Sequence, residues 1–120
     1  MIQWPNSCSR NVKIVPDHHS LADAENVQAD ILIIPGGAPG AKTMSTDDEV
    51  LALIRRLRAD GRWIACICAG TTALVASVLD DSDKVTVTSH PSVADEIKGK
   101  GWSYSEERVA VDGKIITSRG

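Results

Sequence analysis

Short runs rich in aliphatic and β-branched residues recur along the chain, and each run ends at a turn. Three of them lie at 31–34, 63–67 and 85–89. Such runs predict strands, and the absence of polar residues in the first two predicts strands buried on both faces, as in a parallel sheet. A shorter run at 12–15 predicts another strand, which ends at Pro16.

Helical spacing fills the intervals between these runs. One helix is indicated by apolar residues three and four positions apart, namely Val50, Leu53, Ile54 and Leu57. Ser45 is predicted to begin and cap this helix, with acidic residues in its first turn, and Gly61 follows its end. Further helices are predicted at 71–79 and 92–98, with one or two helical turns at 21–26.

The end of the chain has the pattern of a β-hairpin. Two apolar stretches, 108–111 and 114–117, flank Asp112-Gly113. An Asp-Gly pair between two strands favours a two-residue turn of type I′. Strands that alternate with helices and end in a hairpin predict an α/β fold with a mostly parallel sheet.

Composition narrows the class of protein. The chain has 120 residues, of which 42% are hydrophobic and 24% charged, with a net charge of −3. This is the balance of one globular domain. We expect no nucleic-acid partner, because no long basic run occurs, and no membrane partner, because no apolar run spans a bilayer. The odd number of cysteines, three, and a first segment unlike a signal peptide favour the cytoplasm.

Candidate chemistry begins at Cys68, where a predicted strand runs through two small residues into a predicted helix. This strand–turn–helix order is that of a nucleophile elbow, which raises one side chain above the sheet. The N–H groups at the start of a helix stabilise a thiolate and a developing oxyanion. Cys66 stands where the usual elbow has glycine, so a buried structural cysteine is the alternative interpretation.

Two further candidates follow neighbouring predicted strands. Gly36 and Gly37 come after the strand at 31–34, and His90 comes after the strand at 85–89. Because the carboxyl ends of parallel strands share one edge of the sheet, these residues are expected near Cys68. A histidine beside a cysteine can move protons or stabilise the thiolate. A plain Pro-Gly-Gly turn and a structural histidine are the alternatives.

Other motifs fail on spacing. The glycines at 36–40 do not form a dinucleotide-binding fingerprint, and Gly40-Ala41-Lys42-Thr43 is one residue too long for a phosphate-binding loop. His18 and His19 have no metal-ligand spacing with the cysteines. No metal and no cofactor are therefore expected.

Taken together, the segments 30–41, 65–74, 85–91, 104–109 and 112–120 resemble the ThiJ/PfpI superfamily, in the DJ-one branch of Parkinson-linked protein deglycases. The resemblance extends from about residue 7 to residue 120. It implies a flavodoxin-like, doubly wound α/β fold related to class I glutamine amidotransferases. Ala69, where the intracellular-protease branch has histidine, disfavours a protease.

The resemblance also implies roles for single residues. Cys68 matches the oxidation-prone nucleophile, and His90 matches the nearby histidine. Gly37 and Ala69 match the residues whose N–H groups form the oxyanion pocket, with Gly36 beside them. Arg10 matches an arginine near the dimer interface.

The implied activity is that of a glutathione-independent glyoxalase that converts methylglyoxal to lactate, or of a deglycase that removes early glyoxal adducts. The resemblance also implies a role as a redox-responsive chaperone. It further implies that the protein forms a homodimer and that its partner is a small aldehyde. The nucleus and the mitochondrion are alternative compartments.

Family members also contain an earlier strand–helix–strand segment with a glutamate that bonds the nucleophilic thiol, and a final helix. We therefore expect a partial domain over 1–120, with a leader at 1–6 and without the first strand and last helix. Glu25 cannot take the role of that glutamate. The alternative function is a non-catalytic, redox-sensing or chaperone-like fragment.

Overall fold

The computed structural model describes residues 6–7, 13–15, 17, 21 and 29–120. Its strands are β1 (Asn6–Ser7), β2 (Lys13–Ile14), β3 (Ile31–Ile34), β4 (Trp63–Ile67), β5 (Val109–Asp112) and β6 (Ile115–Ser118). Its α-helices are α1 (Ala38–Thr46), α2 (Asp48–Ala59), α3 (Thr71–Ser77) and α4 (Ala94–Gly99). Within the described residues, 3₁₀ turns lie at Cys68–Gly70, Asp81–Asp83 and Pro91–Val93. Apart from Leu21, the helical turns predicted at 21–26 lie outside the described residues, as do Cys8, Arg10, His18, His19 and Glu25.

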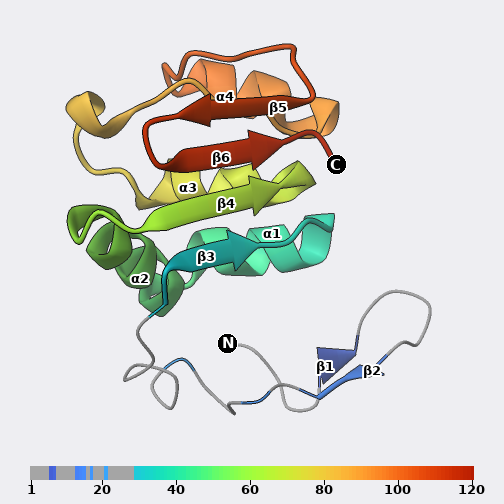
Figure 1. Ribbon diagram of the computed structural model, residues 1–120. Coiled ribbons are helices and arrows are strands. Elements are labelled where there is room, and N and C mark those ends of the chain that lie inside the picture. The colour runs from blue at the N-terminus through green and yellow to red at the C-terminus, as the bar shows by residue number, and fades with distance from the viewer. Residues whose placement is uncertain (1–5, 8–12, 16, 18–20, 22–28) are drawn as a thin grey trace.

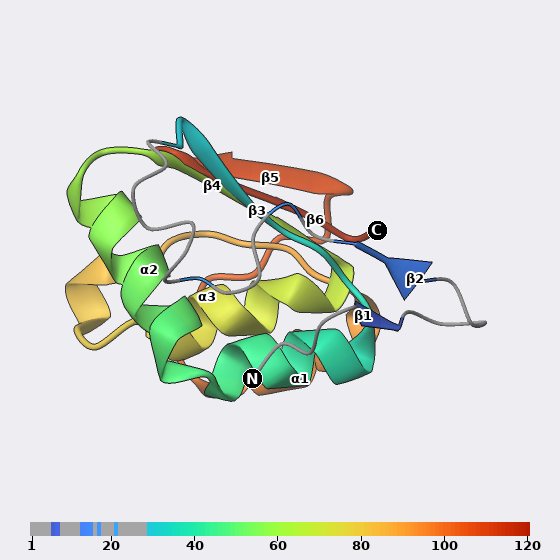
Figure 2. The same cartoon turned by 90° about the horizontal axis from the view of Figure 1, so that it is seen from below.

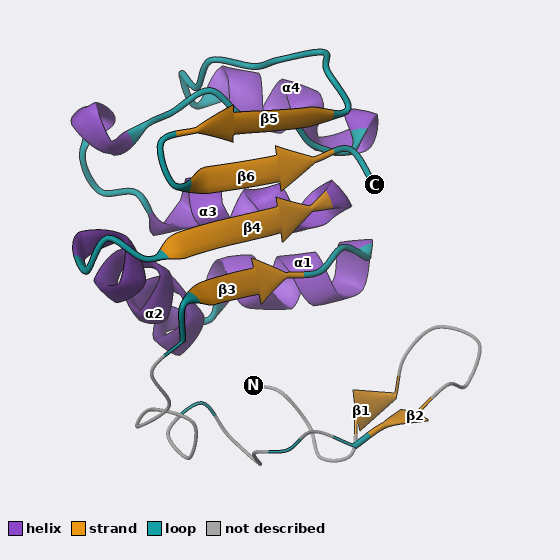
Figure 3. Cartoon of the chain, in the orientation of Figure 1, coloured by secondary structure: helices purple, strands orange, loops and turns teal. Residues whose placement is uncertain are grey.

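The main sheet has four strands in the order β3-β4-β6-β5 (Figures 1 and 3). β3 pairs with β4, and β4 with β6, in parallel, whereas β5 pairs with β6 in antiparallel fashion. A separate antiparallel pair joins β1 to β2, which lies within the strand predicted at 12–15. The α/β class and the mostly parallel sheet are confirmed.

The core lies between this sheet and helices α1, α2 and α3, which share one side of it (Figure 2), and it also includes Ile97 of α4. Ile64 in β4, Ile54 in α2 and Leu74 in α3 are fully buried there. The apolar face of α2 is therefore confirmed, and Gly61, just beyond its end, has the positive φ of 74° expected after a helix.

The other side of the sheet contradicts the sequence prediction. Ile31 and Ile33 in β3 are 41% and 57% exposed, whereas Ile34 is 2% exposed. β4 repeats the pattern, with Trp63 and Ile67 exposed. Burial of both faces of these strands is thus wrong within the described part of the chain. Successive side chains of a strand point to opposite faces, and α1, α2 and α3 cover only one of them.

The boundary between the first two helices also differs from the prediction. α1 begins at Ala38, inside the segment interpreted as a loop, because Pro39 fits the first turn of a helix. Ser45 lies in the last turn of α1 and does not begin α2. The cap of α2 is Asp47, whose Oδ1 accepts hydrogen bonds from the N–H groups of Glu49 (2.9 Å) and Val50 (3.2 Å).

The strand predicted at 85–89 is reduced to one parallel bridge between Val87 and Tyr104. On one side, Val87 donates its N–H to the Ser103 carbonyl oxygen at 3.0 Å and accepts the N–H of Ser105 at 2.8 Å. On the other side, side chains of the hairpin hold the backbone. The Asp112 carboxylate accepts the N–H of Thr86 at 2.8 Å, and the Thr117 hydroxyl accepts the N–H of Thr88 at 2.9 Å. On the side of the hairpin, hydrogen bonds to side chains thus replace a neighbouring strand.

The hairpin itself is confirmed, but its turn type is not. Asp112 pairs with Ile115, so the turn residues are Gly113 and Lys114. Gly113 has a φ of 59°, and Lys114 is not among the described residues with positive φ. Type I′ requires positive φ at both positions, so this turn has the character of type II′.

Candidate active site

The backbone at the end of β4 turns sharply at Cys68. Its φ is 60°, and no other non-glycine residue in the described part of the chain has a positive φ. The 3₁₀ turn Cys68–Gly70 then leads directly into α3. The predicted order of strand, turn and helix is confirmed. A left-handed conformation costs a non-glycine residue about 1–2 kcal/mol and persists only where the surroundings enforce it, as at functional sites.

Gly36 is the neighbour that encloses Cys68 on the side of β3. A Cβ placed on Gly36 would lie 2.6 Å from the Cys68 Cβ and 3.3 Å from its Sγ. Gly70 meets the same loop, because a Cβ there would lie 2.6 Å from the Pro35 carbonyl oxygen. The Pro-Gly-Gly loop and the Cys68 turn therefore pack backbone against backbone, as only glycine permits.

Gly120 encloses the thiol on a second side, although no sequence pattern assigned a role to it. A Cβ on Gly120 would lie 3.3 Å from the Cys68 Cβ and 3.5 Å from its Sγ, and its φ is 115°. The signal was present, because Gly120 belongs to a segment that resembles the ThiJ/PfpI superfamily. Only the folded chain brings the segment to the thiol.

His90 lies beside Cys68 through its backbone. Its N–H donates a hydrogen bond to the Cys68 carbonyl oxygen at 3.1 Å. The side chain is exposed, and its Nδ1 accepts the N–H of Ser92 at 3.0 Å. Among the described residues, the hydrogen bonds of this ring go to Ser92, and none joins it to the thiol.

Gly37 and Ala69 flank the same junction. Gly37 immediately precedes α1, with a φ of 94° that favours glycine. Ala69 follows Cys68 in the 3₁₀ turn and is buried. Gly36, Gly37, Cys68, Ala69 and His90 are thus gathered at one edge of the sheet, as predicted, whereas Arg10 lies outside the described residues.

Buried hydroxyl groups hold the segment before His90 against the Cys68 turn. The Thr71 hydroxyl, at the start of α3, donates to the Thr88 carbonyl oxygen at 3.0 Å. The Thr117 hydroxyl takes the N–H of Thr88 from the opposite side. Thr88 Oγ1 is itself buried and has no hydrogen-bond partner in the described structure. Sequence patterns did not single out these threonines.

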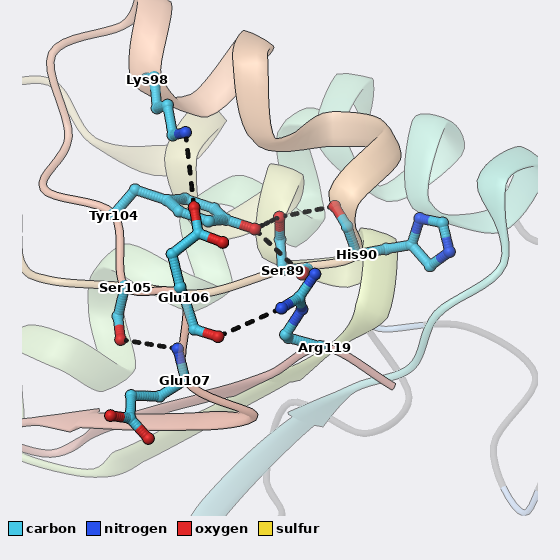
Figure 4. A network of polar contacts seen from close by, with 8 residues as sticks. All are labelled: Ser89, His90, Lys98, Tyr104, Ser105, Glu106, Glu107 and Arg119. Carbon is cyan, nitrogen blue, oxygen red and sulfur yellow. Dashed lines mark hydrogen bonds and ion pairs between the residues drawn. The ribbon is translucent and has the colours of Figure 1, made fainter.

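A second polar network joins Tyr104 and the residues that follow it to Ser89 and to Arg119 (Figure 4). The Tyr104 hydroxyl donates to the Ser89 carbonyl oxygen at 3.1 Å and lies 3.0 Å from the Ser89 hydroxyl. Arg119 Nη1 donates to the Glu106 carbonyl oxygen at 3.1 Å, and the Arg119 N–H donates to the Arg108 carbonyl oxygen at 2.9 Å. Because Gly120 follows Arg119, the two hydrogen bonds of Arg119 also hold Gly120 near the thiol.

Cys66 differs sharply from Cys68. It is 1% exposed and packs in the core. Burial raises the pKa of the Cys66 thiol to about 12, and Arg58 opposes this only in part. Because the thiolate is the nucleophile, Cys66 is unsuited to attack a substrate. Both cysteines are free thiols.

Among the described residues, no cluster of three or more His, Cys, Asp or Glu side chains has a geometry suited to a metal ion. No described helix combines the length and the apolar character needed to cross a membrane.

Comparison with known proteins places these features in a family. A profile of the DJ-1/PfpI family matches residues 3–120. The chain is 42% identical over 118 residues to the Parkinson disease protein 7 homolog of Danio rerio, covering 97% of this chain and 61% of the relative. It is 36% identical over 113 residues to the glutathione-independent glyoxalase DJ-1 of Schizosaccharomyces pombe, covering 93% of this chain and 56% of the relative.

Solved structures agree. The crystal structure of Drosophila melanogaster DJ-1beta superposes with a TM-score of 0.86 at 35% identity, covering 96% of this chain and 60% of that one. The chain therefore spans about three fifths of the length of these relatives. Since the family profile covers nearly every residue and the fold superposes on a member, this flavodoxin-like α/β chain belongs to the DJ-1/PfpI family.

Proposed function

We propose that this chain carries the active site of a cysteine-dependent, glutathione-independent glyoxalase that converts methylglyoxal to lactate, or of a deglycase that removes early glyoxal adducts. The observation that carries the proposal is the strained, partly exposed Cys68 between Gly36 and Gly120. Two relatives, from S. pombe and Caenorhabditis elegans, are named as glutathione-independent glyoxalases, which supports the same activity here.

In the proposed mechanism, the Cys68 thiolate attacks the aldehyde carbon of methylglyoxal and forms a hemithioacetal. The N–H groups of Gly37 and Ala69 stabilise the oxyanion that develops on the former carbonyl oxygen. A hydrogen then moves from the former aldehyde carbon to the neighbouring ketone carbon, assisted by His90, which leaves a lactoyl thioester on Cys68. Water hydrolyses this thioester, so that lactate leaves and the thiol is restored.

The wider setting is part of the proposal. We propose that the chain acts as a homodimer in the cytoplasm, with a small aldehyde or a glycated group as its partner. The free thiols Cys66 and Cys68 are compatible with a reducing compartment. Sedimentation of the purified chain tests the dimer, and a single monomer species at micromolar concentration would contradict it.

Lactate formation from methylglyoxal without added glutathione tests the activity. The full chain is expected to form lactate, and Cys68→Ser is expected to lose that activity by a factor of about 10³ or more, because a hydroxyl is a far weaker nucleophile than a thiol. Cys66→Ala is the matched control and is expected to retain activity. Equal turnover by the chain and by Cys68→Ser would refute the proposal.

The non-catalytic alternative has a distinct outcome in the same experiment. A redox-sensing or chaperone-like chain would form no lactate, whereas mass spectrometry after mild peroxide treatment would still detect oxidised Cys68.

A further inference from the structure

Ser92 contacts the His90 ring with two groups at once. Its backbone N–H donates to His90 Nδ1 at 3.0 Å, and its Oγ lies 2.8 Å from the same nitrogen. The contact arises because His90 is the cap of the 3₁₀ turn Pro91–Val93. A histidine ring nitrogen thus replaces the carboxylate or hydroxyl oxygen that usually caps a helical turn.

This contact assigns the proton of the neutral ring. A backbone N–H can only donate, so Nδ1 must offer its lone pair to Ser92 and cannot carry a proton of its own. The proton of the neutral imidazole therefore lies on Nε2. In that tautomer the Ser92 hydroxyl donates to Nδ1 as well.

The rest of His90 is fixed independently of Ser92. Its N–H donates to the Cys68 carbonyl oxygen at 3.1 Å, and its carbonyl oxygen accepts from the Ser89 hydroxyl at 2.9 Å and from the Val93 N–H at 3.1 Å. Because both the N–H and the carbonyl oxygen of His90 are hydrogen-bonded, the ring can move only by rotation about its side-chain bonds. Within the described structure, the hydrogen bonds that restrain the ring itself come from Ser92.

We propose that Ser92 is a positioning residue that holds His90 in the tautomer with the proton on Nε2, so that His90 donates a hydrogen bond from Nε2 to the substrate and does not act as a base. The identity of the substrate in this inference rests on the proposed function. The tautomer of His90 rests only on its contacts with Ser92. A neutral imidazole that donates in this way stabilises charge on the oxygen atoms of the substrate while hydrogen moves between carbons. A base at Nε2 would need its proton on Nδ1, where the Ser92 N–H is directed.

The experiment combines a spectroscopic and a kinetic measurement on the full chain. Long-range ¹H–¹⁵N correlation spectra of the His90 ring, at a pH where the ring is neutral, report which nitrogen carries the proton. The chain and Ser92→Thr are expected to carry it on Nε2. Ser92→Asp keeps the backbone N–H but replaces the hydroxyl, 2.8 Å from Nδ1, with a carboxylate that can only accept. Because a charge-assisted hydrogen bond from Nδ1–H to this carboxylate is stronger than the neutral bond from the backbone N–H, the variant is expected to break the N–H contact and move the proton to Nδ1.

Kinetics then separate the two roles of His90. Ser92→Asp is expected to lower the kcat for lactate formation about 10²-fold, since it removes the donor at Nε2, with KM within about twofold of the original. Ser92→Thr, which keeps the hydroxyl and the N–H, is expected to keep most of kcat. A merely structural role of Ser92 would not couple the ring tautomer to kcat.

Three results would overturn the inference. They are a proton on Nδ1 in the unmodified chain, an unchanged tautomer in Ser92→Asp, or an increased kcat in that variant. If the chain forms no lactate at all, the proposed function fails, and the ring spectra still decide whether Ser92 fixes the tautomer.

Discussion

Two cysteines that stand two residues apart, one inside β4 and one just past its end, have opposite environments. Cys66 lies within β4, and its side chain packs in the core between the sheet and the helices. Burial raises the pKa of its thiol to about 12. Cys68 lies just past the strand, with a φ of 60° and a partly exposed side chain. A cysteine is therefore not a nucleophile by residue type alone. The two thiols differ because the backbone turn and the neighbouring glycines leave the Cys68 side chain partly exposed, whereas Cys66 is buried.

The largest expected effect comes from filling the space beside Cys68. Gly36→Ala would place a Cβ 2.6 Å from the Cys68 Cβ, so the loop or the turn must shift. We expect a loss of about 2–4 kcal/mol in the free energy of unfolding and a loss of activity of about 10²-fold. Urea denaturation and lactate assays measure the two effects.

Gly40→Ala is the matched control. Gly40 lies within α1, and a Cβ there meets nothing within 4 Å. Alanine in a helix is favoured over glycine by about 0.5–1 kcal/mol, so this variant is expected to gain stability and keep its activity. Equal effects of the two substitutions would show that the contact between Gly36 and Cys68 is unimportant.

The next effect concerns the buried thiol. Cys66→Ser would bury a hydroxyl in an apolar core and is expected to cost about 1–3 kcal/mol of stability. Cys68→Ser, at a partly exposed position, is expected to change the unfolding free energy by less than about 0.5 kcal/mol. Thermal or urea unfolding of both variants checks the difference, and a larger loss at position 68 would reverse the contrast between the sites.

The pH dependence of stability gives a third distinction. The pKa of Cys66 is about 12 in the folded chain, above its ordinary value of 9.0. The folded state therefore keeps a proton that the unfolded state releases. This contribution to stability is fully present below pH 9 and is lost between pH 9 and 12, by up to about 1.4 kcal/mol per pH unit.

Urea unfolding from pH 8 to 10.5 measures this loss. Cys66→Ala is expected to lose stability less steeply with pH than the unmodified chain, because it no longer carries the buried thiol. Identical slopes for the two proteins would mean that the Cys66 thiol does not stay protonated in the fold.

The smallest effect is a gain. Glycine adopts a φ of 60° without strain, so Cys68→Gly is expected to stabilise the chain by about 1 kcal/mol while it abolishes lactate formation. Cys66→Gly, in a strand with a buried side chain, is expected to destabilise it. A loss of stability in Cys68→Gly would mean that the left-handed turn carries no strain.

Sequence patterns predicted the elements whose determinants are local. The apolar spacing of α2, the strand before Cys68 and the small residues after it were sufficient for the elbow. The patterns failed where distant parts of the chain compete for the same groups. In the segment expected as a strand at 85–89, only Val87 pairs with a neighbouring backbone, whereas Asp112 and Thr117, far along the chain, accept the N–H groups of Thr86 and Thr88.

At the candidate active site, too, sequence patterns were sufficient where the determinants are local and failed where distant parts of the chain meet. Gly36, Gly37 and His90 could be placed near Cys68 from the shared edge of parallel strands. Gly120 and Ser92 could not be assigned roles, since one reaches the thiol only through the hairpin and the other acts through a capping contact. The exposed face of β3 was missed because an aliphatic run does not reveal which side a helix covers.

Stoichiometric alkylation distinguishes Cys68 as the nucleophile from Cys66 as a buried, unreactive thiol. One equivalent of iodoacetamide is added to the Cys8→Ser chain at pH 8, and peptide mass mapping and lactate formation are followed together. At that pH only about 10⁻⁴ of a thiol with a pKa of about 12 is ionised. We expect Cys68 to be labelled, Cys66 to stay unlabelled and activity to fall in proportion to labelled Cys68. Labelling of Cys66 first, or full activity with Cys68 fully labelled, would contradict it.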